Sequence, residues 1–410
     1  MYLLTKQFQK SVKAVAVIRY SLTCLFLLCF AQKSYTQDLP AADYLYRAEL
    51  IYANVWKDYQ AQANPGLFTE NYPSAQNDSL TYLQGSAVKE RPVSFLWPLS
   101  GMFSATNALV SIPAVKEKYK PYLIKIISSV EQYRDTTRSP VGYQAYPVKF
   151  EKADRYYDDN GLVGIDEMEA YFNTKNPLYL QRAKTVFTFI ISGWDDQLGG
   201  GVSWLEGHRD QKPACSNGMA ALVALKIYQA TKDPHYLNWG EKFYGWMYEH
   251  LRDSSGVYDN DIKPDGKVNK TFWTYNSGSM LEASVLLYQF TGNKLYLKQA
   301  QQLAISTYTQ FKSASPDSPL LFKIDLPWFV TILFRGYEAL YLQDGNKQYI
   351  TAVEKDLNYA WQHSRDQYGL LTHSWKPNPA DLKKPKWLLD ENCIAELYAR
   401  LYRLKDHSAN

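Results

Sequence analysis

The chain has 410 residues, which is enough for one large domain or two of ordinary size. Tyrosine (34) and tryptophan (11) are abundant, and such rings suit both hydrophobic cores and sugar-binding clefts. The net charge of +4 comes from 45 Lys and Arg against 41 Asp and Glu, so the chain has no basic field that would indicate nucleic acid as a partner.

The chain opens with a basic and then apolar segment. Several Lys and Arg residues precede the apolar run 22–31, which is too short to span a bilayer and is typical of a signal peptide. We therefore expect residues 1–36 to be a signal peptide. The rest, 37–410, is expected to be exported to the periplasm, cell surface or extracellular space, without stable membrane insertion after cleavage. Lipid attachment at Cys24 or Cys29 is the alternative, although neither follows the expected small residues.

Four later stretches resemble one another and form an internal repeat. Each has a helical pattern, a polar turn and a second helical pattern, which together predict a helical hairpin. Two such helices cannot bury their apolar stripes alone, so neighbouring hairpins are expected to stack and share a core. The repeats begin at Tyr171, Tyr228, Tyr288 and Tyr341.

Two further helix pairs precede these repeats. One combines 44–59 with 95–109, and the other combines 122–133 with the helix after Asp159. Six pairs suffice to close a ring, so we expect an all-α fold, an (α/α)6 barrel that forms a single domain over 37–410. An open solenoid is the alternative.

Gly- and Trp-rich connections join the predicted hairpins at 193–204 and 256–276. No core requirement explains this composition. Loops at one mouth of a rigid ring commonly carry function. We therefore expect a cleft at this mouth.

Two adjacent carboxylates, Asp158 and Asp159, open the amphipathic helix that starts the first repeat. Aspartate at a helix start is often a cap or a solvated charge, because the helix dipole favours it there. On a helix, however, consecutive residues are turned by about 100°, so both side chains can reach into one cleft. Retaining glycosidases need two carboxyl groups about 5–5.5 Å apart. Two like charges so close would also raise one pKa and keep that group protonated as an acid.

Four ordered motifs around this pair carry a family resemblance. They are 157–160 (Tyr-Asp-Asp-Asn), 199–204 (Gly-Gly-Gly-Val-Ser-Trp), 217–218 (Asn-Gly) and 274–278 (Thr-Tyr-Asn-Ser-Gly). The sequence resembles glycoside hydrolase family 76 over roughly residues 97–335. The resemblance implies an (α/α)6 barrel and endo-acting α-1,6-mannanase activity on a mannan polysaccharide or oligosaccharide.

The resemblance also implies roles for individual residues. Asp158 corresponds to the nucleophile and Asp159 to the general acid/base of a retaining double displacement. Trp97 and Trp273 are sugar platforms or core residues, with nothing in the sequence to decide between the two. The residues expected to bind substrate are Tyr157, Asn160, Trp97, Gly200, Gly201, Trp204, Asn217, Trp273, Tyr275 and Asn276.

The sequence departs from the family pattern at three places. Gly161-Leu162 stand where a small and then a bulky or aromatic residue is usual, and Ser277 stands where glutamine is common. These changes put subsite detail in doubt but leave the aspartate pair untouched. The polar residues 405–410 contrast with the apolar tail of many fungal relatives. An exported enzyme of bacterial type is therefore expected. We also expect it to be a monomer.

Other candidate residues receive plainer interpretations. The pair at 195–196 lies in a Gly-rich turn and is expected to be structural. A solvated helix face is expected for the acidic residues at 166, 167 and 169. The histidines lack metal-ligand spacing, so neither metal nor cofactor is expected. Cys215 and Cys393 are most simply small buried residues, and a disulfide between them is not predicted.

Two other functions fit the same scaffold. An unsaturated glucuronyl hydrolase would need a cationic cleft, for which Arg155 and Arg209 are the nearby candidates. A surface protein that binds glycans without cleaving them is the non-enzymatic alternative. The intact pair Asp158-Asp159 favours an enzyme.

Overall fold

The computed structural model describes residues 39–74 and 91–407. The chain divides into two units, Met1–Pro40 and Ala41–Asn410, and every helix and strand below belongs to the second. The signal peptide predicted at 1–36 lies outside the described residues. In the described part of the chain, no helix combines the length and apolar character needed to cross a membrane.

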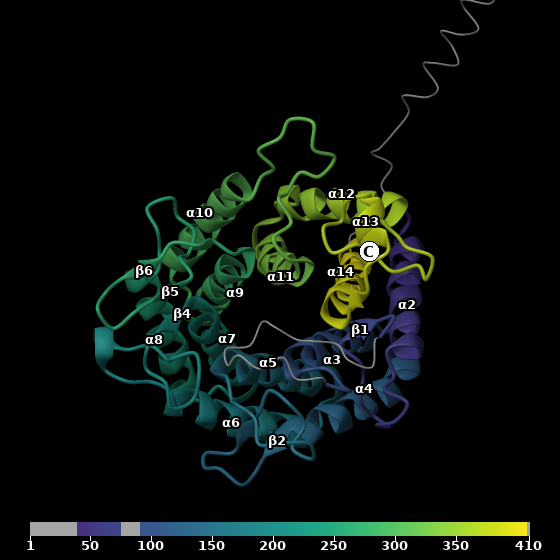
Figure 1. The fold of residues 1–410 in the computed structure, drawn as a ribbon. Helices are drawn as coiled ribbons and strands as arrows, with labels where there is room; N and C mark the ends of the chain where they lie inside the picture. Colours follow the sequence, from purple (N-terminus) through teal and green to yellow (C-terminus); the bar gives the residue numbers. More distant parts are fainter. Residues whose placement is uncertain (1–38, 75–90, 408–410) are drawn as a thin grey trace, which may run out of the picture. The chain divides into compact units, whose positions relative to one another are not determined.

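The second unit is a ring of helices in two layers (Figure 1). The helices of the inner layer are buried on nearly all sides, whereas those of the outer layer bury one face. The predicted (α/α)6 barrel is therefore confirmed. The inner helices are α3 (Leu96–Val110), α5 (Tyr157–Thr174), α7 (Ala214–Thr231), α9 (Thr274–Thr291), α11 (Pro327–Asp344) and α14 (Leu388–His407). The outer helices are α2 (Ala41–Asp58), α4 (Lys116–Val130), α6 (Pro177–Ser192), α8 (Pro234–His250), α10 (Lys294–Gln310) and α12 (Gln348–His363).

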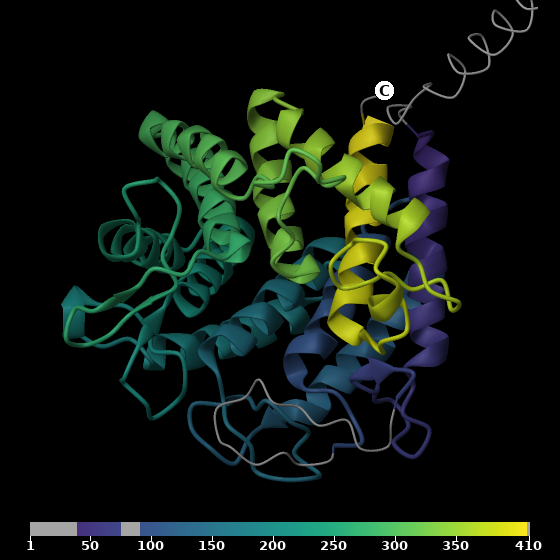
Figure 2. The same cartoon turned by 45° about the horizontal axis from the view of Figure 1, so that its top comes forward.

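The first two predicted helix pairs are wrong. Helix α3 forms its hairpin with α4, to which a short turn connects it, and α2 packs on the last inner helix, α14. Figure 2 shows α2 and α14 side by side. Across this contact, Nη1 of Arg47 donates to the Tyr398 hydroxyl at 3.2 Å. The ring thus closes by joining the two ends of the described chain.

The repeated sequence turns are helix-terminating motifs. At each one, the residue after the inner helix adopts the left-handed conformation, and its N–H donates to the carbonyl of the tyrosine that begins the repeat. In the first three repeats, the next Asn or Asp then caps the following outer helix with its side chain. The left-handed residues are Lys175, Lys232, Gly292 and Gly345, and the capping residues are Asn176, Asp233 and Asn293.

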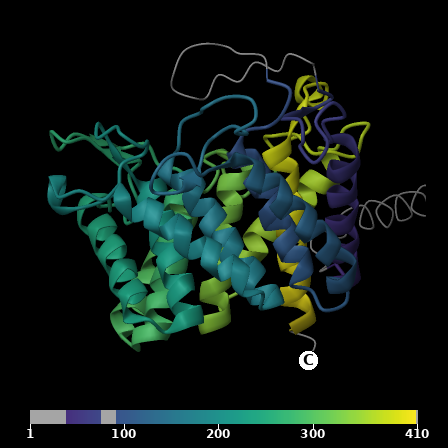
Figure 3. The same cartoon turned by 90° about the horizontal axis from the view of Figure 1, so that it is seen from below.

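Short antiparallel strands lie at the end of the ring opposite the repeated turns, where the longer loops gather (Figure 3). The three-stranded sheet lies in register with Lys212 opposite Ile262 and Asp261 opposite Asn269. The strands pair as β1 (Asn71–Tyr72) with β7 (Lys386–Trp387), β2 (Arg134–Asp135) with β3 (Gly142–Tyr143), and β4 (Lys212–Pro213) with β5 (Asp261–Ile262) and β6 (Val268–Asn269). The remaining short elements are α13 (Pro379–Leu382), η1 (Glu131–Tyr133) and η2 (Gln197–Gly199).

The solvated face predicted for the acidic residues of α5 is wrong. Asp166 is 2% exposed and Glu167 is fully buried, because α5 is an inner helix with neighbours on every side. Asp166 accepts a hydrogen bond of 2.7 Å from the Ser104 hydroxyl. Glu169 forms an ion pair of 2.8 Å with Lys226. These carboxylates therefore contribute to the interior of the ring.

Candidate active site

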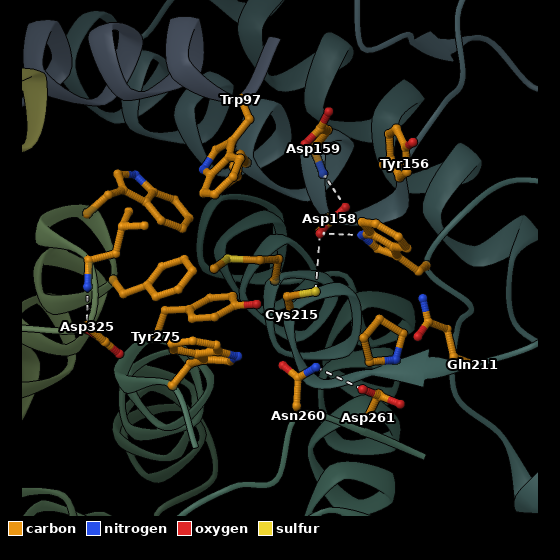
Figure 4. A pocket seen from close by; sticks show the side chains of 18 of the residues that line it. Trp97, Tyr156, Asp158, Asp159, Gln211, Cys215, Asn260, Asp261, Tyr275 and Asp325 are labelled. Carbon is orange, nitrogen blue, oxygen red and sulfur yellow. Dashed lines mark hydrogen bonds between the residues drawn. The ribbon is translucent and has the colours of Figure 1, made fainter. Parts of the chain in front are cut away.

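A cavity of about 540 Å³ lies among the loops and N-terminal ends of the inner helices. One side of it is aromatic, and the opposite side carries the aspartate pair (Figure 4). Its lining residues are Phe95, Trp97, Ala145, Tyr156, Asp158, Asp159, Leu162, Trp204, Gln211, Pro213, Cys215, Met219, Asn260, Asp261, Asn269, Trp273, Tyr275, Asp325, Leu326, Trp328 and Phe329.

Asp158 lies in the first turn of α5 and is held by three hydrogen-bond donors. Its Oδ2 accepts from Nε1 of Trp204 at 3.0 Å and from the thiol of Cys215 at 3.2 Å. Its Oδ1 accepts from the backbone N–H of Asp159 at 3.0 Å. All three donors favour the charged form of the carboxylate over the protonated form.

Asp159 is also half-buried in this first turn, but its surroundings differ. Burial and the charge of Asp158 raise its pKa well above the ordinary value of an aspartate. Burial raises the pKa of Asp158 too, but the hydrogen bonds from Cys215 and Trp204 oppose that rise. The two neighbouring carboxyl groups are therefore differentiated, with Asp159 the better proton donor and Asp158 the better anion.

The aromatic wall faces this pair. Tyr275 stacks on Phe329 with ring centroids 4.0 Å apart and an interplanar angle of 19°. Trp97 meets Trp328 edge to face at 5.5 Å, and Trp273 packs against Phe329 at 5.7 Å. Flat rings of this kind pack against the apolar face of a pyranose. The predicted residues Trp97, Trp204, Trp273 and Tyr275 all line the cavity.

The polar edge of the cavity comes from residues that the sequence reasoning missed. Oδ2 of Asp261 accepts 2.8 Å hydrogen bonds from the side-chain amides of Asn260 and Asn269. Asp325 accepts from the backbone N–H of Thr274 at 2.7 Å and so caps α9. The only signal for Asn260 and Asp261 was their place in the Trp-rich connection at 256–276.

Three predicted substrate-binding asparagines do not line the cavity but brace its walls. Oδ1 of Asn160 accepts from the N–H of Tyr143 at 2.7 Å, and its Nδ2 donates to the same residue's carbonyl at 2.8 Å. Asn217 binds the N–H and C=O of Val202 in the same way, at 2.8 and 3.0 Å. Asn276 is fully buried, and its Nδ2 lies 3.4 Å from Oδ1 of Asn260. Each amide thus fixes a neighbouring loop.

The other three predicted substrate-binding residues also lie behind the lining. Tyr157 stacks on Phe189 at 4.9 Å. A Cβ on Gly200 would lie 2.2 Å from the Trp194 ring, and one on Gly201 would lie 2.7 Å from the Trp246 ring. The glycines therefore admit tryptophan rings closely, and their positive φ angles of 139° and 85° also favour glycine.

The two departures at Gly161 and Leu162 have a packing explanation. A Cβ on Gly161 would lie 2.6 Å from the Cβ of Met219, so a glycine lets α5 approach α7. Leu162 lines the cavity beside the aspartate pair. Here the aromatic side chains of the cavity come from other elements.

No lysine, arginine or histidine lines the cavity, as far as the described residues form it. Arg155 is buried and forms an ion pair with Glu206, and Arg209 lies 3.7 Å from Asp195. Asp195 also forms an ion pair of 2.6 Å with Lys212 and does not line the cavity, which is consistent with the structural role expected for it. The described lining of the cavity therefore offers no cation for an acidic sugar.

The described cysteines form no disulfide, and the described side chains form no metal-binding group. Both Cys215 and Cys393 are buried free thiols. Within 39–74 and 91–407, no group of three or more His, Cys, Asp and Glu side chains is arranged to hold a metal ion.

Comparison with known proteins finds similarity to glycoside hydrolases that act on mannan. The family model described as glycosyl hydrolase family 76 matches residues 46–326. The mannan endo-1,6-alpha-mannosidase DCW1 of Saccharomyces cerevisiae is 32% identical over 160 residues, which cover 34% of this chain and 35% of that protein. DCW1 of Candida glabrata is 33% identical over 156 residues, again 35% of its length. The match thus spans about a third of the length of these curated relatives.

Solved structures extend the similarity over most of the chain. The family 76 mannosidase Bt3792 from Bacteroides thetaiotaomicron is 28% identical, with a TM-score of 0.79, and the match covers 89% of this chain and 100% of that one. The α-1,6-mannanase GH76A from Salegentibacter sp. HEL1_6 has a TM-score of 0.70, with coverage of 88% and 99%. Its identity of 22% supports the shared fold alone.

Proposed function

The chain belongs to glycoside hydrolase family 76, and we propose that it is an exported, retaining endo-α-1,6-mannosidase that hydrolyses the backbone of α-mannan. The observation that carries this proposal is the unequal environment of Asp158 and Asp159 beside an aromatic cavity. Export rests on the signal peptide predicted at 1–36.

The two carboxyl groups match the two roles of a retaining glycosidase. Asp158, held ionised by its three donors, attacks the anomeric carbon. Asp159, held protonated, gives its proton to the departing glycosidic oxygen. In the second half of the reaction Asp159 accepts a proton from water, and that water displaces Asp158 from the covalent glycosyl-enzyme intermediate.

The substrate assignment combines the cavity with the names of relatives. DCW1 is described as a mannan endo-1,6-alpha-mannosidase and Bt3792 as a mannosidase. An aromatic wall with no cation among the described lining residues suits a neutral sugar better than a uronic acid. This argues against the unsaturated glucuronyl hydrolase alternative, whose acidic substrate would meet Asp158, Asp159, Asp261 and Asp325.

The direct test is hydrolysis of linear α-1,6-mannan, with an unsaturated uronide as control substrate. We expect a ladder of oligosaccharides from mannan, no product from the uronide, and an initial product of retained α configuration by NMR. Asp158→Asn and Asp159→Asn should each lower kcat by at least about 10³-fold. Asp196→Asn, which changes an exposed aspartate of the other adjacent pair, is the matched control and should keep wild-type activity. Near-normal rates in either active-site variant would overturn the assignment, and glycan binding without hydrolysis by the wild type would favour the non-enzymatic alternative.

A further inference from the structure

The ammonium group of Lys212 is enclosed by the Gly-rich hairpin, residues 193–204, which connects α6 to α7. Lys212 lies in β4, two residues before α7 begins, and is 1% exposed. Its Nζ donates to Oδ1 of Asp195 at 2.6 Å, to the carbonyl of Gln197 at 2.5 Å and to the carbonyl of Gly200. The Asp195 carbonyl accepts as well, at 3.3 Å. A buried charge is costly unless it is paired, and these oxygens are the partners that the ammonium requires.

The tip of the hairpin needs such an anchor because its backbone is unusual. The four consecutive residues 198–201 all have positive φ, and the side chain of Leu198 makes this conformation unfavourable there. The carbonyls of Gln197 and Gly200, in the same turn, both bind the ammonium. An unfavourable backbone conformation persists only where its surroundings hold it. Lys212 holds this one from another segment of the chain.

The stem of the hairpin carries Trp204 to the aspartate pair. Trp194 and Val202 pair across the stem as an antiparallel bridge. Two residues after Val202, the indole of Trp204 donates to Oδ2 of Asp158 at 3.0 Å. The anchored tip is therefore continuous with the strand that presents this indole to the carboxylate.

The backbone of Lys212 leads directly to a second donor of the same carboxylate. Cys215 lies in the first turn of α7, three residues after Lys212, and its thiol donates to Oδ2 of Asp158 at 3.2 Å (Figure 4). Asn217, in the same turn, binds the N–H and C=O of Val202 in the hairpin. Through its side chain and its backbone, Lys212 thus joins the two segments that supply the side-chain donors of this oxygen.

We propose that Lys212 is a positioning residue, which fixes the Gly-rich hairpin so that the Trp204 indole keeps its hydrogen bond to Asp158. This inference rests on the proposed function of Asp158 as nucleophile. Lys212 is not among the described residues that line the cavity. It acts on the carboxylate through Trp204.

Lys212→Met, which keeps most of the side chain and removes its ammonium, tests the proposal. We expect kcat/KM on a mannan oligosaccharide to fall about tenfold, mainly through kcat, as for the loss of one hydrogen bond to a charged group. The acidic limb of the pH profile should move to higher pH, because Asp158 loses a donor that favours its charged form. In a Trp204→Phe background, Lys212→Met should move the acidic limb no further, because the N–H through which Lys212 acts is already absent.

Lys386 offers a matched control. It lies in β7, two residues before the inner helix α14, and is 3% exposed. Its Nζ donates to three backbone carbonyls and forms an ion pair of 3.4 Å with Asp366. Its loop carries none of the three donors of Asp158, so Lys386→Met should lower Tm but keep kcat and the acidic limb. A shift of the acidic limb in both lysine variants, or in neither, would overturn the proposal.

A milder variant decides the question where Lys212→Met does not fold. Asp195→Asn keeps the size of the side chain that binds the ammonium but removes its charge. It should move the acidic limb in the same direction as Lys212→Met, by a smaller amount, whereas Asp196→Asn, at the exposed neighbour, should leave the limb in place. An acidic limb that is unchanged in Asp195→Asn would then count against Lys212.

A measurement without substrate separates this inference from the proposed function. In protein with isotope-labelled tryptophan, the NMR signal of the Trp204 indole N–H is assigned by its loss in Trp204→Phe. In Lys212→Met the indole proton should move upfield, because its hydrogen bond to a carboxylate is weakened, and in Lys386→Met it should not move. An unmoved signal in Lys212→Met would contradict the proposal. A wild-type enzyme that is inactive on mannan would contradict the proposed function and leave this NMR outcome intact.

Discussion

The indole of Trp204 donates its single N–H to Oδ2 of Asp158 at 3.0 Å, although Trp204 lies in the connection between α6 and α7 and Asp158 in the first turn of α5. The backbone next to Asp158 is also joined to Trp204, since the N–H of Tyr157 donates to the carbonyl of Trp204 at 2.9 Å. The loop before α7 is thus fastened to the first turn of α5. This relationship makes Trp204 both a wall of the cavity and a donor to one of the two carboxylates.

Replacing Trp204 by Phe should therefore weaken the enzyme through Asp158. The ring remains but its N–H is lost, and a hydrogen bond to a charged group contributes about 1.5–3 kcal/mol, so kcat/KM should fall roughly 10- to 100-fold. The pKa of Asp158 should rise, and the acidic limb of the pH profile should move to higher pH. Trp239→Phe, in the outer layer, is the control and should keep both properties. An unchanged acidic limb in Trp204→Phe would argue against ionised Asp158 as the acting group.

The pH dependence of the wild type should show two limbs of opposite origin. Activity should be lost as the pH falls and Asp158 becomes protonated, and the raised pKa of Asp158 moves this limb above the usual range of an aspartate. Activity should also be lost as the pH rises and Asp159 gives up its proton. Burial and the charge of Asp158 raise the pKa of Asp159 well above that of an ordinary aspartate, so this loss should come at a correspondingly higher pH. The measurement is kcat/KM against pH on a mannan oligosaccharide. Activity that keeps rising into the alkaline range would contradict Asp159 as the acid.

The aromatic wall should contribute to binding more than to the chemical step. Trp97→Ala and Trp273→Ala each remove a ring that lines the cavity but makes none of the hydrogen bonds of Asp158. An aromatic contact of this kind is worth about 0.5–1.5 kcal/mol beyond its buried area, so we expect KM to rise about 3- to 10-fold with kcat nearly unchanged. Steady-state kinetics on mannan oligosaccharides measures this split. Unchanged KM in both variants would show that these rings serve the core rather than the sugar.

Two neighbouring glutamates of α5 should influence stability with opposite dependence on pH. Burial raises the pKa of Glu167 to about 8, so its contribution to stability is present at pH values below its unfolded pKa and is lost as the pH rises toward 8. Lys226 and neighbouring arginines lower the pKa of Glu169 to about 2 against the opposing effect of burial. Its contribution is therefore present above the unfolded pKa and is lost as the pH falls toward 2.

Thermal unfolding of the two matched variants measures this difference. Glu167→Gln should reduce the loss of Tm between pH 5 and pH 8, because a neutral side chain replaces one that must ionise in the interior. Glu169→Gln should lower Tm at neutral pH, because it breaks the 2.8 Å ion pair with Lys226. The same pH dependence in both variants would contradict the assigned burial of Glu167.

Much of the fold was readable from local patterns. The turn after Tyr171 could be predicted because its left-handed residue and its Asn176 cap bind groups only a few positions away. The same holds for the start of α5, where Asp158 and Asp159 occupy the first turn as expected. The pairing of α2 with α14 was missed, because the ends of a closed ring meet through packing and their sequences carry no local sign of it.

The sequence by itself therefore determined the four repeated helical hairpins and the aspartate pair at a helix start, since each depends on interactions within a few residues. The number of helix pairs also predicted a ring, but packing decided how that ring closes. Tertiary structure alone decided which polar residues face the cavity. Asn160 and Asn217 turn away to bind loop backbone, whereas Asp261 and Cys215 arrive at the cavity from other elements. The physical reason is that the direction of a side chain within a ring depends on how each helix is rotated against its neighbours and on where the loops cross, and both follow from packing between residues far apart in the chain.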